Sequence, residues 1–397
     1  MVKLYRNLCE AVVDVLESIF NENRYADKAI EKMLKQNVRW GSRDRRFIAE
    51  TAYDIVRWYR LLGYLSDAPS DVWKLMGAWF LLNKSPDLPP WDEFQGLNAK
   101  IILDKYEQAK RIRKIHESIP DWLDELGEAE LGEKWSIEIQ ALNEEAKVVL
   151  RVNTLKVQRE ELKDELENED ILTEAIREYP DALILNQRQN IFSQPLFKDG
   201  LFEVQDAGSQ LIAPFLNVEP GHRVIDACAG GGGKTLHLAA LMQNKGRIIA
   251  MDTEEWKLEE LKKRARRAGA SNIIETRLIE SSKTIKRLEN SADRLLLDVP
   301  CSGLGVLKRN PDAKWKLSME FIESVKSIQQ KILQEYCGML KPGGLMVYST
   351  CSILSSENEK QVERFLSEKK EFQLLKEKMI YPSKGFDGFY MALMKRS

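Results

Sequence analysis

The chain has 397 residues, of which 43% are hydrophobic and 31% are charged, so it can bury a sizeable core and is long enough for two or three domains. Its 60 basic residues are balanced by 62 acidic ones, which excludes a protein that holds nucleic acid by general positive potential. No stretch approaches the roughly 18 uninterrupted apolar residues of a membrane span, and the first residues resemble no signal peptide. We therefore expect a cytoplasmic protein without membrane contact.

The first part of the chain is predicted to be helical, because apolar residues recur there at helical spacing. These residues are Leu4, Leu8, Val12, Val15, Leu16 and Ile19. A second amphipathic segment follows Gly41 and carries arginines on its other faces, at positions 43, 45, 46, 57 and 60. The arginines form either a solvated face or a patch for RNA phosphates, and both interpretations stay open. We expect a helical domain over residues 1–125 and a helical connector over 126–146.

The pattern changes at Lys147 to short β-like runs. They cover residues 148–153, 182–185 and 201–205, and a charged helical segment at 158–168 separates the first two. This mixture predicts a small α/β subdomain over residues 147–215.

From residue 216 to 397, short apolar strands alternate with helices. The strands are expected at 223–226, 247–252, 272–278, 294–298 and 344–349, and a long amphipathic helix at 320–340. Such alternation predicts an α/β fold with a doubly wound, largely parallel sheet that is covered on both faces. Ligands of such sheets bind at the carboxyl ends of the strands.

A glycine-rich loop follows the first of these strands. Four consecutive glycines, Gly230–Gly233, allow the backbone to approach a ligand closely, and Asp252 ends the next strand, where a carboxylate can accept hydrogen bonds from ribose hydroxyls. A Walker A loop would need glycine at Cys228, and the G-x-G-x-x-G spacing fits poorly because Lys234 follows the glycines directly. The loop is therefore either a tight strand-to-helix turn or, with Asp252, a site for a cofactor with an adenosine-type ribose.

The five cysteines are an odd number without C-x-x-C spacing, so neither a disulfide framework nor a metal site is favoured. Cys9, Cys228 and Cys337 are interpreted as inert core residues. Cys301 and Cys351 differ, since both stand just beyond strand ends in polar loops where exposed amides favour a thiolate. A thiolate is the form of cysteine that attacks an electron-poor ring carbon.

These motifs resemble those of one enzyme family, the bacterial Sun/Fmu family of S-adenosylmethionine-dependent RNA cytosine-5 methyltransferases, whose best-known members modify 16S ribosomal RNA and carry a NusB-like helical domain in front. The resemblance covers nearly the whole chain. It rests on the segments 44–46, 150–156, 204–210, 298–303, 349–352, 357–359 and 385–390, among which the Pro-Cys and Thr-Cys pair at Cys301 and Cys351 is highly specific. It implies a Rossmann-like methyltransferase domain over 216–397, after the small α/β subdomain and the helical NusB-like domain.

The resemblance also implies a cofactor site and a partner. S-adenosylmethionine would be held by the loop Cys228, Ala229, Gly230, Gly231, Gly232, Gly233 and Lys234, together with Asp252, Asp298 and, on the adenine side, Glu280. The family usually has proline where this chain has Gly231, which predicts a more flexible loop, and aspartate where it has Glu280. The partner would be RNA, with 16S ribosomal RNA favoured over transfer RNA, and we expect a monomer.

The catalytic roles implied by the resemblance are those of a thiol-dependent methyl transfer. Cys351 would be the nucleophile that adds to C6 of cytosine, and Cys301 would assist release of the product. Addition of a thiolate to C6 turns the ring into an enamine-like donor at C5. Charge that develops at N3 could be stabilised by a neutral Asp298.

RNA must reach this edge of the sheet with its target base unstacked. Basic residues with one tryptophan follow the Pro-Cys strand, and they form either a clamp for phosphates and a stacked base or a solvated loop; they are Lys308, Arg309, Lys314, Trp315 and Lys316. For the basic residues at 262–267, a solvated helix face is the better interpretation.

Two other functions remain possible. In a DNA cytosine-5 methyltransferase, the thiol of Cys301 rather than that of Cys351 would attack. A non-catalytic RNA-binding scaffold could have lost cofactor affinity through Gly231 and Glu280.

Overall fold

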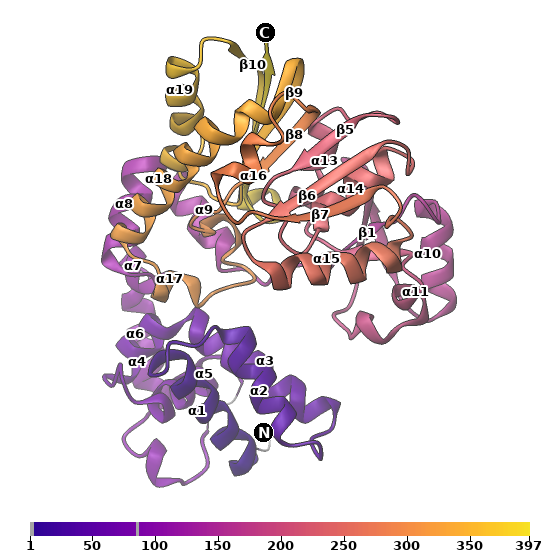
Figure 1. Ribbon diagram of the computed structural model, residues 1–397. Coiled ribbons are helices and arrows are strands. Elements are labelled where there is room, and N and C mark those ends of the chain that lie inside the picture. The colour runs from indigo at the N-terminus through magenta and orange to yellow at the C-terminus, as the bar shows by residue number, and fades with distance from the viewer. Residues whose placement is uncertain (1–3, 85–86) are drawn as a thin grey trace. The chain divides into compact units, whose positions relative to one another are not determined.

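A computed structural model describes residues 4–84 and 87–397 of the chain (Figure 1). The chain divides into two compact units. One contains the residues up to Glu144 together with Leu307–Met319, and the other contains Glu145–Val306 and Glu320–Ser397. Among the described residues, no helix is both long enough and apolar enough to cross a membrane.

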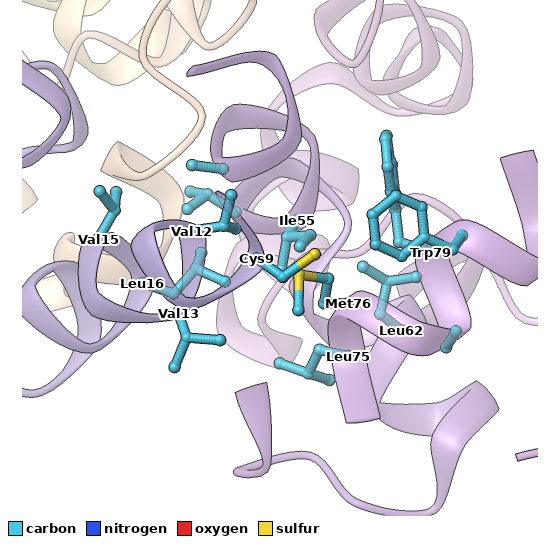
Figure 2. Packing of buried hydrophobic residues seen from close by; sticks show 14 of the residues in the cluster. Cys9, Val12, Val13, Val15, Leu16, Ile55, Leu62, Leu75, Met76 and Trp79 are labelled. Atoms are coloured by element: carbon cyan, nitrogen blue, oxygen red, sulfur yellow. The ribbon is translucent and has the colours of Figure 1, made fainter. Parts of the chain in front are cut away.

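The first unit is built from helices. They are α1 (Arg6–Phe20), α2 (Ala26–Gln36), α3 (Ser42–Arg57), α4 (Tyr59–Ser66), α5 (Val72–Asn83), α6 (Ala99–Ala109), α7 (Arg113–His116), α8 (Asp121–Leu131), α9 (Lys134–Leu142) and α17 (Ala313–Lys316). The apolar stripes of α1, α3 and α5 meet in one core, where Cys9 lies among aliphatic and aromatic side chains (Figure 2). Cys9 is 0% exposed, which confirms its predicted place in the core, and burial raises its pKa to about 12.

Most of the arginines around α3 have structural partners. Arg45 donates hydrogen bonds to backbone carbonyls, including that of Leu34 at 2.9 Å. Arg57 is buried and bonds the carbonyl of Lys308 at 2.8 Å, and Arg60 pairs with Asp121 at 2.8 Å. Only the exposed side chains at 43 and 46 keep the character of a solvated basic face.

The segment Leu307–Met319 belongs to the helical unit, although it follows the Pro-Cys strand in the sequence. Lys308 is 3% exposed, and its Nζ lies 3.1 Å from the carboxylate of Glu144. Lys314 is 1% exposed and donates a hydrogen bond to the Asn143 side chain at 3.1 Å. Burial lowers the pKa of Lys314 well below its usual value.

Trp315 in the same segment donates a hydrogen bond from its indole nitrogen to the carbonyl of Val56 at 2.7 Å and meets the ring of Tyr59 edge-on. Lys316 lies 3.2 Å from Asp312, and both side chains are largely buried. The prediction that Lys308, Lys314, Trp315 and Lys316 clamp RNA is therefore wrong, because these side chains anchor the segment within the helical unit.

The second unit contains a small antiparallel sheet of order β2-β3-β1-β4. Its strands are β1 (Val149–Val152), β2 (Thr173–Ile176), β3 (Tyr179–Leu185) and β4 (Phe202–Val204). Helix α10 (Arg159–Asn168) buries Leu162 and Leu166 in the same core as this sheet. Strand β2 was not predicted, because a four-residue strand with half-exposed positions has no clear alternation.

The larger sheet has seven strands in the order β10-β11-β9-β8-β5-β6-β7. They are β5 (Arg223–Asp226), β6 (Arg247–Asp252), β7 (Ile274–Leu278), β8 (Ala292–Asp298), β9 (Leu340–Thr350), β10 (Phe372–Ile380) and β11 (Phe389–Arg396). Strands β5 to β9 pair in parallel, whereas β11 and β10 add antiparallel strands at one side. The five predicted strands form the parallel part.

Helices cover both faces of this sheet (Figure 1). On one face, α13 (Ile212–Phe215), α14 (Gly233–Leu241) and α15 (Glu255–Ala268) share an apolar core with the strands. On the other face, the core contains residues of α16 (Ser282–Lys286), α18 (Met319–Tyr336) and α19 (Glu359–Glu368). This is the doubly wound α/β architecture that the alternating pattern predicted.

Candidate active site

The parallel strands bring their carboxyl ends to one edge of the large sheet. Asp226 ends β5, Asp252 ends β6 and Asp298 ends β8. In the pairing of β8 with β9, Asp298 lies opposite Ser349. The loops that follow these strands therefore meet at the same edge, where open α/β sheets bind ligands.

The two thiols that follow β8 and β9 lie next to each other. The Sγ atoms of Cys301 and Cys351 are 3.2 Å apart, and both residues are partly exposed. The hydrogen bond to Cys351, followed by burial, raises the pKa of Cys301 well above its usual value. Either sulfur can donate the hydrogen bond between them, and the raised pKa favours the protonated form of Cys301.

Asp298 ends β8, three residues before Cys301, and is held by two side chains. Lys234 Nζ is 2.5 Å from one carboxylate oxygen, and Ser349 Oγ donates to the other at 2.8 Å. Burial opposes a charge on Lys234, but Asp298 and then Cys351 outweigh it and raise the pKa of the lysine. The Asp298 carboxyl group therefore lies at ion-pair distance from Lys234, and its neutral form stays a prediction.

The glycine loop adopts the backbone conformation for which glycine is needed. Gly230 and Gly232 have φ values of +53° and +84°. The amide of Gly230 donates a hydrogen bond to Asp252 at 2.9 Å, and that of Glu254 donates to the other oxygen of the same carboxylate at 3.0 Å. A Cβ atom built on Gly230 would meet nothing within 4 Å, so the loop faces open space there.

Two arginines hold this loop by its backbone carbonyls: Arg151, which the sequence analysis did not single out, and Arg264, for which the predicted solvated helix face is wrong. Arg264 of α15 donates to the carbonyl of Gly231 at 2.7 Å, and Arg151 of β1 donates to the carbonyl of Gly233. Glu203 is 4% exposed and pairs with Arg264 at 2.9 Å. The expected flexibility at Gly231 is therefore opposed by a charged hydrogen bond to its backbone.

The remaining predicted cofactor residues lie along the same edge. Cys228 and Ala229 form the start of the loop, and burial raises the pKa of the Cys228 thiol well above its usual value. Glu280 is exposed and lies two residues beyond β7, whose last residue, Leu278, pairs with Asp252. Its contact with a cofactor stays a prediction.

Comparisons with known proteins match most of the chain. A family model described as 16S rRNA methyltransferase RsmB/F matches residues 213–395, and a ferredoxin-like domain of RsmF/B-like methyltransferases matches residues 119–192. The probable ribosomal RNA small subunit methyltransferase B of Synechocystis sp. is 34% identical over 399 residues, which cover 90% of this chain and 89% of that protein. The ribosomal RNA small subunit methyltransferase B of Pasteurella multocida is 33% identical, covering 77% of this chain and 72% of the relative.

Solved structures share the fold. The structure of PH0851 has a TM-score of 0.84 and 24% identity, with both chains covered completely. A methyltransferase homolog protein from Pyrococcus horikoshii has a TM-score of 0.63 and 27% identity, covering 72% of this chain and 98% of the other. With the fold, the paired thiols and relatives of over 30% identity along most of its length, the chain belongs to the RsmB/F family of 16S rRNA methyltransferases.

Proposed function

We propose that this protein transfers a methyl group from S-adenosylmethionine to C5 of a cytosine in 16S ribosomal RNA, through a transient bond between Cys351 Sγ and C6 of the base. The single observation that carries the proposal is the approach of two thiols to 3.2 Å at the edge of the sheet that also carries the glycine loop. Relatives named as ribosomal RNA small subunit methyltransferases support RNA as the substrate.

The residues of the glycine loop fit the proposed cofactor. Open space at Gly230 permits the backbone to lie close to a bound ligand. Asp252 is 8% exposed and ends β6, where a carboxylate can accept hydrogen bonds from ribose hydroxyls. When bound, S-adenosylmethionine supplies an electrophilic methyl group, which C5 of the base accepts.

Cys351 begins the reaction as a thiolate. Its Sγ forms a bond to C6, and the electron pair of the C5–C6 double bond moves onto the ring, so that C5 becomes nucleophilic. Lys234, held by Asp298, interacts electrostatically with Cys351, and a neighbouring cation is a common feature of nucleophilic cysteines. The same ion pair holds a proton that can stabilise the negative charge developing at N3 of the cytosine.

Release of the product reverses the addition. A base removes the proton from C5, the electron pair of the C5–H bond restores the C5–C6 double bond, and the bond from C6 to Cys351 Sγ breaks with its electron pair on sulfur. Cys301 carries a proton 3.2 Å from the departing sulfur, so its hydrogen bond can stabilise the thiolate that leaves. In this way Cys351 is the nucleophile and Cys301 assists release.

Single substitutions of the two thiols test the assignment. Cys351→Ala should abolish methyl transfer to RNA, because it removes the proposed nucleophile. Cys301→Ala should bind RNA normally but accumulate a covalent enzyme–RNA adduct, which is visible as a band of retarded mobility on a denaturing gel. Reversed phenotypes would instead favour the DNA type of cytosine methyltransferase, in which Cys301 attacks.

The identity of the RNA is tested separately. Bisulfite sequencing of cellular RNA with and without the gene should show the loss of one modified cytosine in 16S ribosomal RNA. Loss of a modified cytosine in transfer RNA alone would replace the proposed substrate. Absence of S-adenosylmethionine binding at millimolar concentration by calorimetry would favour the non-catalytic scaffold.

A further inference from the structure

A buried carboxylate binds the residues that follow the two thiols. Glu357 ends the short 3-10 turn Ser355–Glu357 after β9 and is 0% exposed. Its hydrogen-bond donors within the described chain are all neutral. The backbone amide of Ser302 donates at 2.8 Å, Ser352 Oγ at 2.6 Å and Gln329 Nε2 at 3.0 Å, and Ser302 Oγ donates as well.

The serines that bind this carboxylate are the residues directly after the two thiols. Ser302 follows Cys301, and Ser352 follows Cys351. One side chain therefore connects two loops that are 50 residues apart in the sequence. These hydrogen bonds are not needed to hold the sheet together, because β8 and β9 already pair along their length as far as Asp298 and Ser349.

Two further contacts extend this arrangement. Gln329 of α18 donates to Glu357 and also to the carbonyl of Pro300 at 3.0 Å, immediately before Cys301. Asn358 is fully buried; it donates to the carbonyl of Ser352 at 3.0 Å and accepts a hydrogen bond from Thr350. The backbone is thus held on both sides of each thiol.

The charge of Glu357 acts on the same pair. After the hydrogen bond to Cys351 and burial, the electrostatic effects of Cys351 and Glu357 also raise the pKa of Cys301. A buried carboxylate with four donors but no cation is energetically demanding. Its electrostatic effect helps to keep the Cys301 thiol protonated.

We infer that Glu357 is a positioning residue that holds the loops of Cys301 and Cys351 together, so that the two sulfurs stay at hydrogen-bond distance. The catalytic consequence rests on the proposed function, but the geometric part does not. A carboxylate can accept all four hydrogen bonds, whereas a glutamine has one acceptor oxygen and can keep only part of them. An alanine keeps none.

The geometric part is tested with the free protein, without RNA or cofactor. Diamide removes two electrons and two protons from a pair of neighbouring thiols, which become a disulfide while diamide is reduced to the hydrazine. In the wild-type protein, a Cys301–Cys351 disulfide should form fast and be detectable by peptide mass spectrometry. Its formation should slow strongly in Glu357→Ala and less in Glu357→Gln. An unchanged rate in a folded Glu357→Ala protein would overturn the inference.

The catalytic part is tested by steady-state kinetics of the same variants. Glu357→Ala should lower kcat about a hundredfold, the loss that a displacement of about 1 Å can cause, with KM for RNA and the dissociation constant of S-adenosylmethionine close to wild type. Glu357→Gln should restore part of kcat. If disulfide formation slows but kcat does not change, the thiol pair is positioned as inferred and the proposed function fails.

A matched pair of glutamines provides the control. Gln329 and Gln330 are neighbours on α18 and both are buried, but Gln330 donates to the carbonyl of Gln361 at 2.7 Å. Gln329→Leu should slow disulfide formation, while Gln330→Leu should not. These two variants also test the inference if Glu357→Ala does not fold. Equal rates of disulfide formation in the two glutamine variants would contradict it.

Discussion

Asp226 shows how burial at the base of the site affects a single carboxyl group. It is 1% exposed, accepts a hydrogen bond from Thr235 at 2.7 Å, and has no partner for its other oxygen within the described residues. Burial raises the pKa of Asp226 from 3.8 to about 7. Ionised Asp226 therefore destabilises the folded protein.

The raised pKa of Asp226 makes the stability of the folded protein depend on pH. Because the folded pKa lies above the unfolded one, the contribution of Asp226 to stability is fully present below about pH 4 and is lost as the pH rises through 7. Asp226→Asn should therefore stabilise the protein more at pH 8 than at pH 5, by up to about 3 kcal/mol, because about two pH units separate pH 5 from the folded pKa at about 1.4 kcal/mol per unit. The thermal midpoint at both pH values measures this difference.

Asp293→Asn is the matched control. Burial alone would raise the pKa of Asp293, but hydrogen bonds from Lys341 and from the Arg223 amide lower it below its usual value. This substitution should destabilise the protein at pH 8, opposite to the effect at Asp226. An equal midpoint shift of Asp226→Asn at both pH values would contradict the account of its burial.

At the scale of single residues, the thiols could be predicted and their supporting residues could not. Cys301 and Cys351 each end an apolar β-like run in a polar loop, which is visible in the sequence. Arg151, Arg264 and Glu357 bind partners 82, 33 and 55 positions away. A lone charged residue in such a segment is usually exposed to solvent, and only the tertiary fold reveals a buried partner.

At the scale of elements, the hydrogen bond from Arg264 of helix α15 to the glycine loop can be tested by substitution. Arg264→Gln removes the charged hydrogen bond to the Gly231 carbonyl, a contact of roughly 1.5 kcal/mol that corresponds to about tenfold in affinity. We expect the dissociation constant of S-adenosylhomocysteine, measured by calorimetry, to rise by that factor because the loop is held less well.

Arg266→Gln is the control for this measurement, since Arg266 lies on the same helix and is exposed. It should leave the dissociation constant unchanged. Equal affinities of the Arg264→Gln and wild-type proteins would show that the loop is held without this contact.

The five parallel strands were predictable because continuous apolar runs alternate with amphipathic helices. Strands β10 and β11 were not among the predicted strands. Most positions of β10 are exposed or half-exposed, and charged residues at 376–378 interrupt its alternation. Its pairing with β11 supplies the stability that the local sequence does not indicate.

At the scale of the whole molecule, the division of the chain differs in one respect from a simple succession of domains. The segment Leu307–Met319 leaves the catalytic part of the sequence and belongs to the helical unit. In sequence, its lysines and Trp315 resemble an RNA-binding loop, because RNA-binding loops also combine basic and aromatic residues. Only burial distinguishes them. The domain boundaries at 125, 146 and 215 stay predictions.

The central claim is the bond between one sulfur and the target base, and trapping that bond tests it most directly. RNA that contains 5-fluorocytidine cannot lose a proton from C5, so the adduct persists after methyl transfer. Digestion and mass spectrometry then identify the modified peptide. The account predicts that the nucleotide is attached to Cys351. Attachment to Cys301, or the absence of any adduct in a protein that methylates unmodified RNA, would contradict it.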